Sequence, residues 1–390
     1  MQRFTIPRDL YFGEDALSHL NTIKGTKAFI VIGSQRLVND GTVPAAVEYL
    51  KAAGIESELF VGVENDPSVA TVMKGVEAMN KFQPDVIIGI GGGSPIDAAK
   101  AMWIFYEHPT FTFEEAAKPF NLPELRNKAK FIAVPTTSGT ATEVTSFAVI
   151  TDNETNIKYP IADYNITPDV AIVDTNLVQT MPKGLVANTG MDALTHALEA
   201  YVSKARNPFT DALAMKSIEM IADTLINSYN GEDQPRKDMH IAQNLAGMAF
   251  SNAILGIVHS MAHKTGKVLN IAHGLANAIY LSYAIEFNAK DKVGKAQYAH
   301  AAKTIGLAGN NETELVESLV NLVKELREQM NMPHSLKEFG IEEEFFLANL
   351  DEIARTSVAD PCTGTNPREI SVEEMKNLFK AVYYGEKVTF

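Results

Sequence analysis

The chain has 390 residues, which exceeds one ordinary compact domain and suits two. Its 46% hydrophobic and 21% charged residues are typical of a globular protein, and a formal net charge of -14 disfavours nucleic acid or an anionic membrane as a partner. The single cysteine excludes an intrachain disulfide. Because the sequence shows no signal-peptide core and no apolar run near the ~20 residues of a membrane span, we expect a cytoplasmic protein.

From the N-terminus onward, short apolar runs alternate with segments of helical character. This alternation is typical of a parallel sheet that helices cover on both faces. The sequence therefore predicts a nucleotide-binding α/β domain over residues 1–180. The expected strands lie at 28–32, 58–63, 86–90, 131–134 and 170–173.

A run of three glycines follows the third of these strands. Pro95 suits the first position of a helix, with Ser94 and Asp97 spaced as its N-cap and N3 residues. A glycine-lined helix N-terminus at the end of a strand binds pyrophosphate through backbone N–H groups and the helix dipole. A plain tight turn is the alternative, since the spacing differs from the GxGxxG fingerprint. The cofactor-binding candidates of this turn are Gly92, Gly93, Ser94 and Asp97.

A second turn, rich in hydroxyl groups, follows the strand at 131–134. We expect its threonines to bond phosphate or ribose oxygens, although helix capping alone also explains such a stretch. A further candidate, Asp66, lies in the turn that follows the second strand. These cofactor-binding candidates are Thr136, Thr137 and Thr140, together with Asp66 and Lys158.

Beyond Met181 and Pro182 the character of the sequence changes. Segments at 208–228, 238–255 and 312–330 carry apolar residues at helical spacing, with few strand-like runs. We expect residues 181–390 to form an all-helical domain.

Two pairs of polar residues at helical spacing occur in the second half. Asp192 and His196 lie four residues apart, as do His259 and His263, and His273 follows. Each pair projects from one helix face, which alone is more typical of a surface hydrogen bond. Four of the nine histidines, however, lie in segments rich in small and apolar residues. A metal ion would offset the cost of desolvating them, and core histidines paired with neighbours are the alternative.

Carboxylate and imidazole ligands without a thiolate suit Fe(II), Zn(II) or a related divalent ion. Four protein ligands close a tetrahedral zinc site. A catalytic ion must therefore expand its coordination here, which Fe(II) does more readily, so Fe(II) is favoured and Zn(II) is the alternative.

These motifs closely resemble the iron-dependent (group III) alcohol dehydrogenase family over essentially the whole chain. The matching segments are 91–97, 135–140, 174–199 and 259–274, of which the last two are very specific. Residues 101–109 look like clostridial butanol dehydrogenases. The resemblance implies an N-terminal Rossmann-like domain, a C-terminal helical, metal-binding catalytic domain, and usually a homodimer.

The resemblance also implies roles for single residues. It places the metal on Asp192, His196, His259 and His273, and it places His263 beside the ligands, near the nicotinamide. His263 is therefore our candidate for the catalytic residue that relays the proton to solvent. The implied reaction transfers hydride between the cofactor and a small aliphatic primary alcohol or aldehyde, such as butanol and butanal. The metal would polarise the carbonyl group as a Lewis acid.

The cofactor preference follows from the segment after the first strand. Many family members that use NAD have an aspartate there, which would repel a 2′-phosphate. Here the segment contains Gly33, Ser34 and Arg36, and a hydroxyl and a cation without a carboxylate would accept that phosphate. NADP(H) is therefore favoured over NAD(H), and a solvated Arg36 is the alternative.

Other activities stay open. A NAD-dependent polyol or diol dehydrogenase, or a lyase-like relative of dehydroquinate synthase, would suit the same scaffold. Apolar residues expected near the metal, Phe147, Phe250 and Leu255, favour a small aliphatic substrate. A nucleotide- or metal-sensing protein without activity would not need four ligands and a further histidine. Cys362 receives no role.

Overall fold

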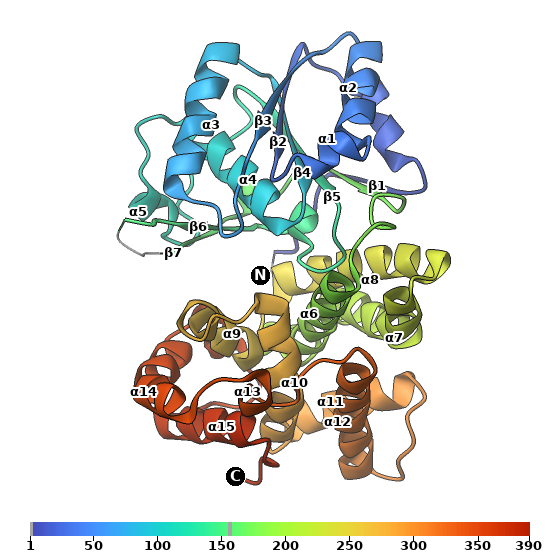
Figure 1. Cartoon of the computed structure of the whole chain (residues 1–390), viewed down its shortest axis with the longest axis vertical. Coiled ribbons are helices and arrows are strands. Elements are labelled where there is room, and N and C mark those ends of the chain that lie inside the picture. The colour runs from blue at the N-terminus through green and yellow to red at the C-terminus, as the bar shows by residue number, and fades with distance from the viewer. Residues whose placement is uncertain (1–2, 155–157) are drawn as a thin grey trace. The chain divides into compact units, whose positions relative to one another are not determined.

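The computed structural model describes residues 3–154 and 158–390. The chain forms two compact units, Met1–Thr180 and Met181–Phe390, which Figure 1 draws mostly in blue to green and in green to red. The first unit combines a parallel sheet with helices and the second is helical, which confirms the predicted fold class.

The first unit is built on a six-stranded parallel sheet (Figure 1). Its strands are β1 (Asp9–Gly13), β2 (Lys27–Ile32), β3 (Glu56–Val61), β4 (Val86–Gly91), β5 (Lys130–Pro135) and β8 (Val170–Asp174), and a separate antiparallel pair comprises β6 (Phe147–Thr151) and β7 (Lys158–Ala162). The spatial order is β1-β8-β5-β4-β2-β3. Because β3 and β4 lie on opposite sides of β2, the chain changes direction across the sheet between β2 and β4. Ligands of such sheets bind beyond the carboxyl ends of the strands at this point.

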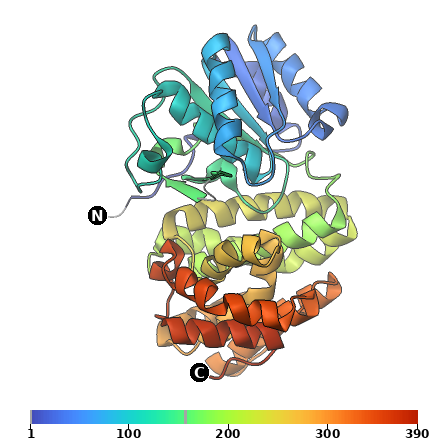
Figure 2. The same cartoon turned by 60° about the vertical axis from the view of Figure 1, so that its left-hand side comes forward.

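Helices cover both faces of this sheet (Figures 1 and 2). The helical segments of the first unit are η1 (Ala16–Thr22), α1 (Arg36–Asn39), α2 (Thr42–Ala52), α3 (Val69–Phe82), α4 (Gly93–Glu107), α5 (Phe113–Ala116), η2 (Thr142–Val144) and η3 (Tyr164–Ile166). Successive side chains of β2 enter two different apolar cores. Phe29 and Val31 pack in the core that contains Trp103 of α4, whereas Ile30 and Ile32 pack in the core that contains α2. Burial on both faces explains why these strands are continuous apolar runs in the sequence.

The strand predictions need two corrections. The second strand covers Glu56–Val61 rather than 58–63, because Gly62 adopts a φ of 103° and ends it. The apolar pattern also does not predict β1, β6 or β7. β1 is an edge strand whose residues are exposed or only half-buried, so it needs no continuous apolar run.

Every element of the second unit is helical. Its segments are α6 (Lys183–Val202), α7 (Pro208–Asn230), α8 (Asp233–Ala253), α9 (Ile257–Val268), α10 (His273–Asn288), α11 (Lys292–Thr304), α12 (Glu312–Gln329), α13 (Leu336–Phe339), α14 (Glu343–Val358), η4 (Pro361–Thr365) and α15 (Val372–Tyr384). Among the described residues, no single helix has both the length and the apolar character to cross a membrane; α8 and α9 meet the criterion only together, across a bend of 101°.

α6 and α10 form the buried centre of the second unit. All residues from Gly190 to Val202 of α6 are buried, as are all residues from Ala276 to Ile285 of α10. The two helices approach closely at Gly274, where an added Cβ would lie 2.4 Å from the backbone oxygen of Asn188. A glycine is therefore required at the start of α10, directly after His273.

We expect Gly274→Ala to destabilise the protein by about 1–3 kcal/mol, because backbone atoms cannot yield to the added methyl group as a side chain does. Gly184→Ala is the matched control, since Gly184 lies in α6 with nothing within 4 Å of its added Cβ. The control should be neutral or stabilising by up to about 1 kcal/mol. Urea unfolding followed by circular dichroism measures both, and equal stabilities would contradict the close approach.

Candidate functional site

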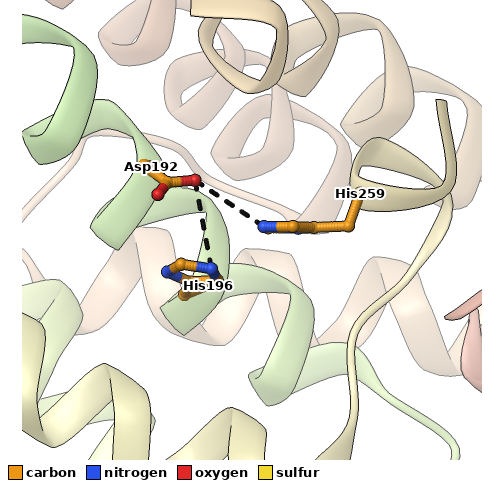
Figure 3. A group of neighbouring side chains, drawn as sticks. All are labelled: Asp192, His196 and His259. Atoms are coloured by element: carbon orange, nitrogen blue, oxygen red, sulfur yellow. Dashed lines mark ion pairs between the residues drawn. The ribbon is translucent and has the colours of Figure 1, made fainter. Parts of the chain in front are cut away.

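Asp192 and His196 begin the candidate site on one face of α6. The two residues are one helical turn apart, and Asp192 Oδ1 lies 3.9 Å from His196 Nε2 (Figure 3). Both side chains are buried. The spacing in the sequence therefore predicts correctly that the two side chains lie close together. The alternative, a hydrogen-bonded pair on the protein surface, is wrong because both side chains are buried.

Two further imidazoles approach the same carboxylate oxygen. His259 of α9 points its Nε2 at Asp192 Oδ1 over 3.7 Å (Figure 3), and His273 Nε2, at the first residue of α10, lies 3.7 Å from the same atom. His259 is buried, but the His273 side chain is 44% exposed. Three helices thus bring four predicted ligand side chains together, with His273 on the accessible side.

The spacing of these atoms fits a metal ion. A tetrahedral ion with bonds of about 2.0–2.3 Å separates its ligand atoms by about 3.3–3.8 Å. The three oxygen–nitrogen distances of 3.7–3.9 Å are close to that range. Asp192, His196 and His259 offer ligand atoms that all lie within 4.8 Å of one another, so these three groups suit one ion, and His273 would join them by a further movement of its partly exposed side chain.

The charges of the site support one another. Burial opposes ionisation of Asp192, but the neighbouring imidazoles outweigh it and hold the pKa of Asp192 well below its usual value. Burial likewise lowers the pKa of His259, but hydrogen bonds and charge interactions with Asp192 and Glu199 outweigh it and raise the pKa to about 9. The carboxylate is therefore ionised at neutral pH and attracts cations.

Asn277 and Glu199 also belong to the site, although the sequence did not indicate them. Asn277 Nδ2 lies 2.6 Å from Asp192 Oδ1, 3.0 Å from His259 Nε2 and 3.2 Å from His273 Nε2. Glu199 contacts the other nitrogen of His259, with Oε2 2.5 Å from Nδ1. The available signal was helical spacing, since Asn277 follows His273 by four residues and Glu199 follows His196 by three.

His263 lies beside this cluster. Its ring stacks on that of His273, with centroids 5.6 Å apart, and its side chain is 38% exposed. His263 Nδ1 is 3.2 Å from Asp360 Oδ2, which also pairs with Lys264 at 2.8 Å. Burial opposes ionisation of Asp360, but hydrogen bonds and charge interactions with His263 and Lys264 outweigh it and lower the pKa of Asp360. The buried Asp360, which the sequence analysis missed, thereby holds one nitrogen of an accessible imidazole.

Of the apolar residues expected near the metal, Phe250 borders the cluster. The Phe250 ring stacks on His196 with centroids 4.3 Å apart, and Leu255 is buried in the same unit. Phe147, grouped with them from the sequence, belongs to β6 of the first unit. The thiol of Cys362 lies in reach of His263 and Asp360, and burial raises its pKa well above the usual value.

In the first unit, the predicted cofactor turns gather at the carboxyl edge of the sheet. An added Cβ on Gly92 would lie 3.3 Å from Thr137 Oγ1, and one on Gly93 would lie 3.2 Å from Thr140 Oγ1. Thr136 N–H donates to Gly91 O at 2.8 Å. The glycine turn and the hydroxyl turn therefore touch.

The start of α4 differs from the sequence prediction. α4 begins at Gly93 with Gly92 as its N-cap, and no side chain caps it. The predicted N-cap role of Ser94 and the predicted first helical position of Pro95 are therefore wrong by two residues, because the extended Gly92 already provides the non-helical residue that precedes a helix. Asp97 does not cap the helix either, since its Oδ2 accepts a hydrogen bond from Val149 N–H at 3.1 Å.

Lys100, which the sequence analysis did not single out, holds the two turns in place. Its fully buried ammonium donates to the backbone oxygens of Thr142, Thr145 and Phe147 at 2.7–2.9 Å. Burial lowers the pKa of Lys100, and the nearby Asp97 carboxylate opposes that shift. A lysine one turn after Asp97 in an otherwise apolar helix was the available signal.

The remaining cofactor candidates lie near the ends of other strands. An added Cβ on Gly33 would lie 3.1 Å from Val63 O, and Ser34 and Asp66 are exposed. Arg36 donates to Thr180 Oγ1 at 2.7 Å. The segment itself carries no carboxylate, but Asp40 Oδ2, one helical turn away, lies 3.8 Å from Arg36 Nε. The side chain of Lys158 lies outside the described part of the structure.

Comparisons with known proteins agree with this arrangement. Residues 7–175 match the model of iron-containing alcohol dehydrogenase, and residues 186–383 match the C-terminal model of the Fe-containing alcohol dehydrogenase family. The NADPH-dependent butanol dehydrogenase of Clostridium saccharobutylicum is 59% identical over 390 residues, covering 100% of both chains.

Solved structures of related enzymes have the same fold. The iron-containing alcohol dehydrogenase of Thermococcus thioreducens has 35% identity and a TM-score of 0.92, over 98% of this chain and 100% of the other. A 1,3-propanediol oxidoreductase has 34% identity and a TM-score of 0.91, with the same coverage. From its sequence and its fold, the chain belongs to the iron-containing alcohol dehydrogenase family.

Proposed function

We propose that this enzyme interconverts small aliphatic aldehydes and primary alcohols, such as butanal and butanol, with NADP(H) at a divalent metal ion. The observation that carries the proposal is the approach of three imidazole nitrogens to Asp192 Oδ1 within 3.7–3.9 Å, in a member of the iron-containing alcohol dehydrogenase family. The 59% identical relative is described as an NADPH-dependent butanol dehydrogenase, which supports the substrate and the cofactor.

The ligands of the ion would be Asp192, His196, His259 and His273. Fe(II) is favoured over Zn(II), because four protein ligands already complete a tetrahedral zinc site and the substrate oxygen needs a fifth position. When bound, the ion would polarise the aldehyde oxygen and the dihydronicotinamide would supply hydride. The exposed side of the cluster, at His273, is where a substrate would approach.

His263 is the proposed catalytic residue for proton transfer. In the reducing direction the product oxygen needs a proton, and a partly exposed imidazole next to the cluster can exchange one with solvent. Asp360 holds His263 Nδ1 at 3.2 Å, which leaves Nε2 for the transfer. Phe250, stacked on His196, would limit access of water and favour an aliphatic substrate.

NADP(H) would bind across the carboxyl edge of the first unit's sheet. The start of α4 and the turn with Thr136, Thr137 and Thr140 offer backbone N–H and hydroxyl groups to its phosphates. Ser34 and Arg36 would accept the 2′-phosphate. The Arg36–Asp40 pair, at 3.8 Å and exposed, is weak, so Arg36 can exchange it for a phosphate.

A diol is the second candidate substrate, because the chain is similar to a 1,3-propanediol oxidoreductase over 98% of its length. Comparing kcat/KM for butanal and 3-hydroxypropanal decides between the two, and a preference for the hydroxylated aldehyde would favour the diol enzyme.

The family resemblance also leads us to propose a cytoplasmic homodimer, for which light scattering measures the molar mass.

We expect His273→Ala to lose the metal and, with it, activity by about 10³-fold or more, since Lewis-acid stabilisation is worth several kcal/mol. The fold should persist, because the side chain is 44% exposed. Anaerobic purification with elemental analysis, followed by a butanal assay, measures both. A variant with wild-type metal content would remove His273 from the ligands.

His263→Ala should retain the metal, because Asp192, His196, His259 and His273 would hold the ion without it, while His263 Nδ1 pairs with Asp360 at 3.2 Å. Turnover should fall by about 10²–10⁴-fold, the usual contribution of a positioned acid or base. Small amines added as proton donors should restore part of the rate. A metal-free variant would instead identify His263 as a ligand.

Arg36→Ala should lower kcat/KM for NADPH by about 10–100-fold and change that for NADH little, because a charge-assisted hydrogen bond to the 2′-phosphate is lost. Arg8→Ala is the control, since that guanidinium also pairs with an aspartate, at 2.8 Å from Asp9. A wild-type preference for NADH, or equal effects of both variants, would contradict the assignment.

A further inference from the structure

We infer that Glu199 is a positioning residue that sets the tautomer and orientation of His259 and thereby determines how tightly the protein holds its metal ion. This inference rests on the proposed function, in which His259 is a ligand. Nothing in the comparisons assigns a role to Glu199.

Glu199 shares one helix face with the proposed ligands of α6. It follows His196 by three residues and Asp192 by seven, so all three side chains project toward α9. Glu199 is 2% exposed. A buried carboxylate is costly unless hydrogen-bond donors satisfy both of its oxygens.

Each oxygen of Glu199 has a donor from α9. Oε1 accepts a hydrogen bond from the backbone N–H of Val258 at 2.7 Å, and Oε2 lies 2.5 Å from His259 Nδ1. Val258 belongs to the first turn of α9, where a carboxylate also complements the helix dipole. An added Cβ on Gly256 would lie 2.8 Å from Oε1, so the backbone closely surrounds this carboxylate.

These contacts decide which nitrogen of His259 carries the proton. A carboxylate oxygen accepts hydrogen bonds, so the contact of Glu199 Oε2 assigns a hydrogen to His259 Nδ1. When the ion is bound, Nε2, which lies 3.7 Å from Asp192 Oδ1 and 3.0 Å from Asn277 Nδ2, would therefore present its lone pair to the ion. A metal ligand needs this lone pair, and carboxylates that hold the other nitrogen typically change metal affinity by about 10–100-fold.

A purely structural role for Glu199, as the cap of α9, predicts a different result. Glu199→Gln separates the two roles, because glutamine has the same size but only one accepting oxygen. The backbone N–H of Val258 is always a donor, so it keeps its hydrogen bond to the single accepting oxygen of the glutamine. The amide nitrogen then faces His259 Nδ1, which favours the tautomer with hydrogen on Nε2 and blocks the ligand position.

The experiment measures the zinc affinity of the full-length protein by competition with a chromophoric chelator, since Zn(II) avoids oxidation. Glu199→Gln should bind Zn(II) about 10–100-fold more weakly than wild type while the metal-free proteins unfold at similar temperatures. The matched control is Glu107→Gln, which also removes a buried carboxylate that accepts backbone N–H groups, from Arg126 and Asn127 at 2.9 Å. It should lower stability and leave zinc affinity unchanged.

Two outcomes would overturn the inference. One is wild-type zinc affinity in Glu199→Gln, and the other is an equal loss in Glu107→Gln. If His273→Ala still loses its metal in either case, the proposed function survives and only the role of Glu199 fails. A wild-type protein that binds no zinc or iron would overturn both.

A second measurement does not depend on whether the variant folds. Nitrogen NMR of the zinc-loaded wild-type protein, with ¹⁵N-labelled histidine, reports the protonation of each ring nitrogen. We expect His259 to carry a hydrogen on Nδ1 and to bind zinc through Nε2. Zinc bound through Nδ1 would overturn the inference.

Discussion

The buried Asp192 carboxylate is the group around which the second unit is organised. Removing a carboxylate from water is costly, and the surrounding helices compensate it with donors and imidazoles. α6 provides His196, α9 provides His259, and α10 provides His273 and Asn277. Because three helices must meet at one oxygen atom, their packing is tightly constrained. The close approach of α10 to α6 at Gly274 is one consequence.

The first unit also contains a buried charged group that its surroundings compensate, but this group is a cation rather than a carboxylate. Lys100 is a buried cation that backbone oxygens of a neighbouring loop neutralise in part. The hydrogen bonds connect α4 to the loop after β5, so the two turns proposed to bind the cofactor form one rigid edge. In each unit a buried charged group thus fixes the position of a neighbouring loop or helix end. The proposed cofactor and metal ion would bind at these fixed segments. Preorganisation of this kind lowers the cost of ordering a site when its ligand arrives.

Much of the fold and the centre of the site follow from local patterns. Continuous apolar strands such as β2 and β4 predict a two-sided parallel sheet, and the spacing of Asp192 and His196 predicts one helix face. These patterns succeed because they depend on residues close in sequence. The sequence did not predict β1, because an edge strand buries too little of its surface to need an apolar run. The predicted start of α4 was wrong, because three successive glycines allow several helix starts.

What the sequence by itself determined is therefore the two-part architecture, the membership of the family and the identity of the candidate ligands, since periodicity and specific motifs are local properties. Only the tertiary structure decided which neighbours orient those ligands. Glu199, Asn277 and Asp360 contact His259, Asp192 and His263 across separations set by helix packing, between 60 and 97 residues along the chain. The partners of a buried polar group cannot be read from the neighbouring sequence, because they depend on which helix faces meet.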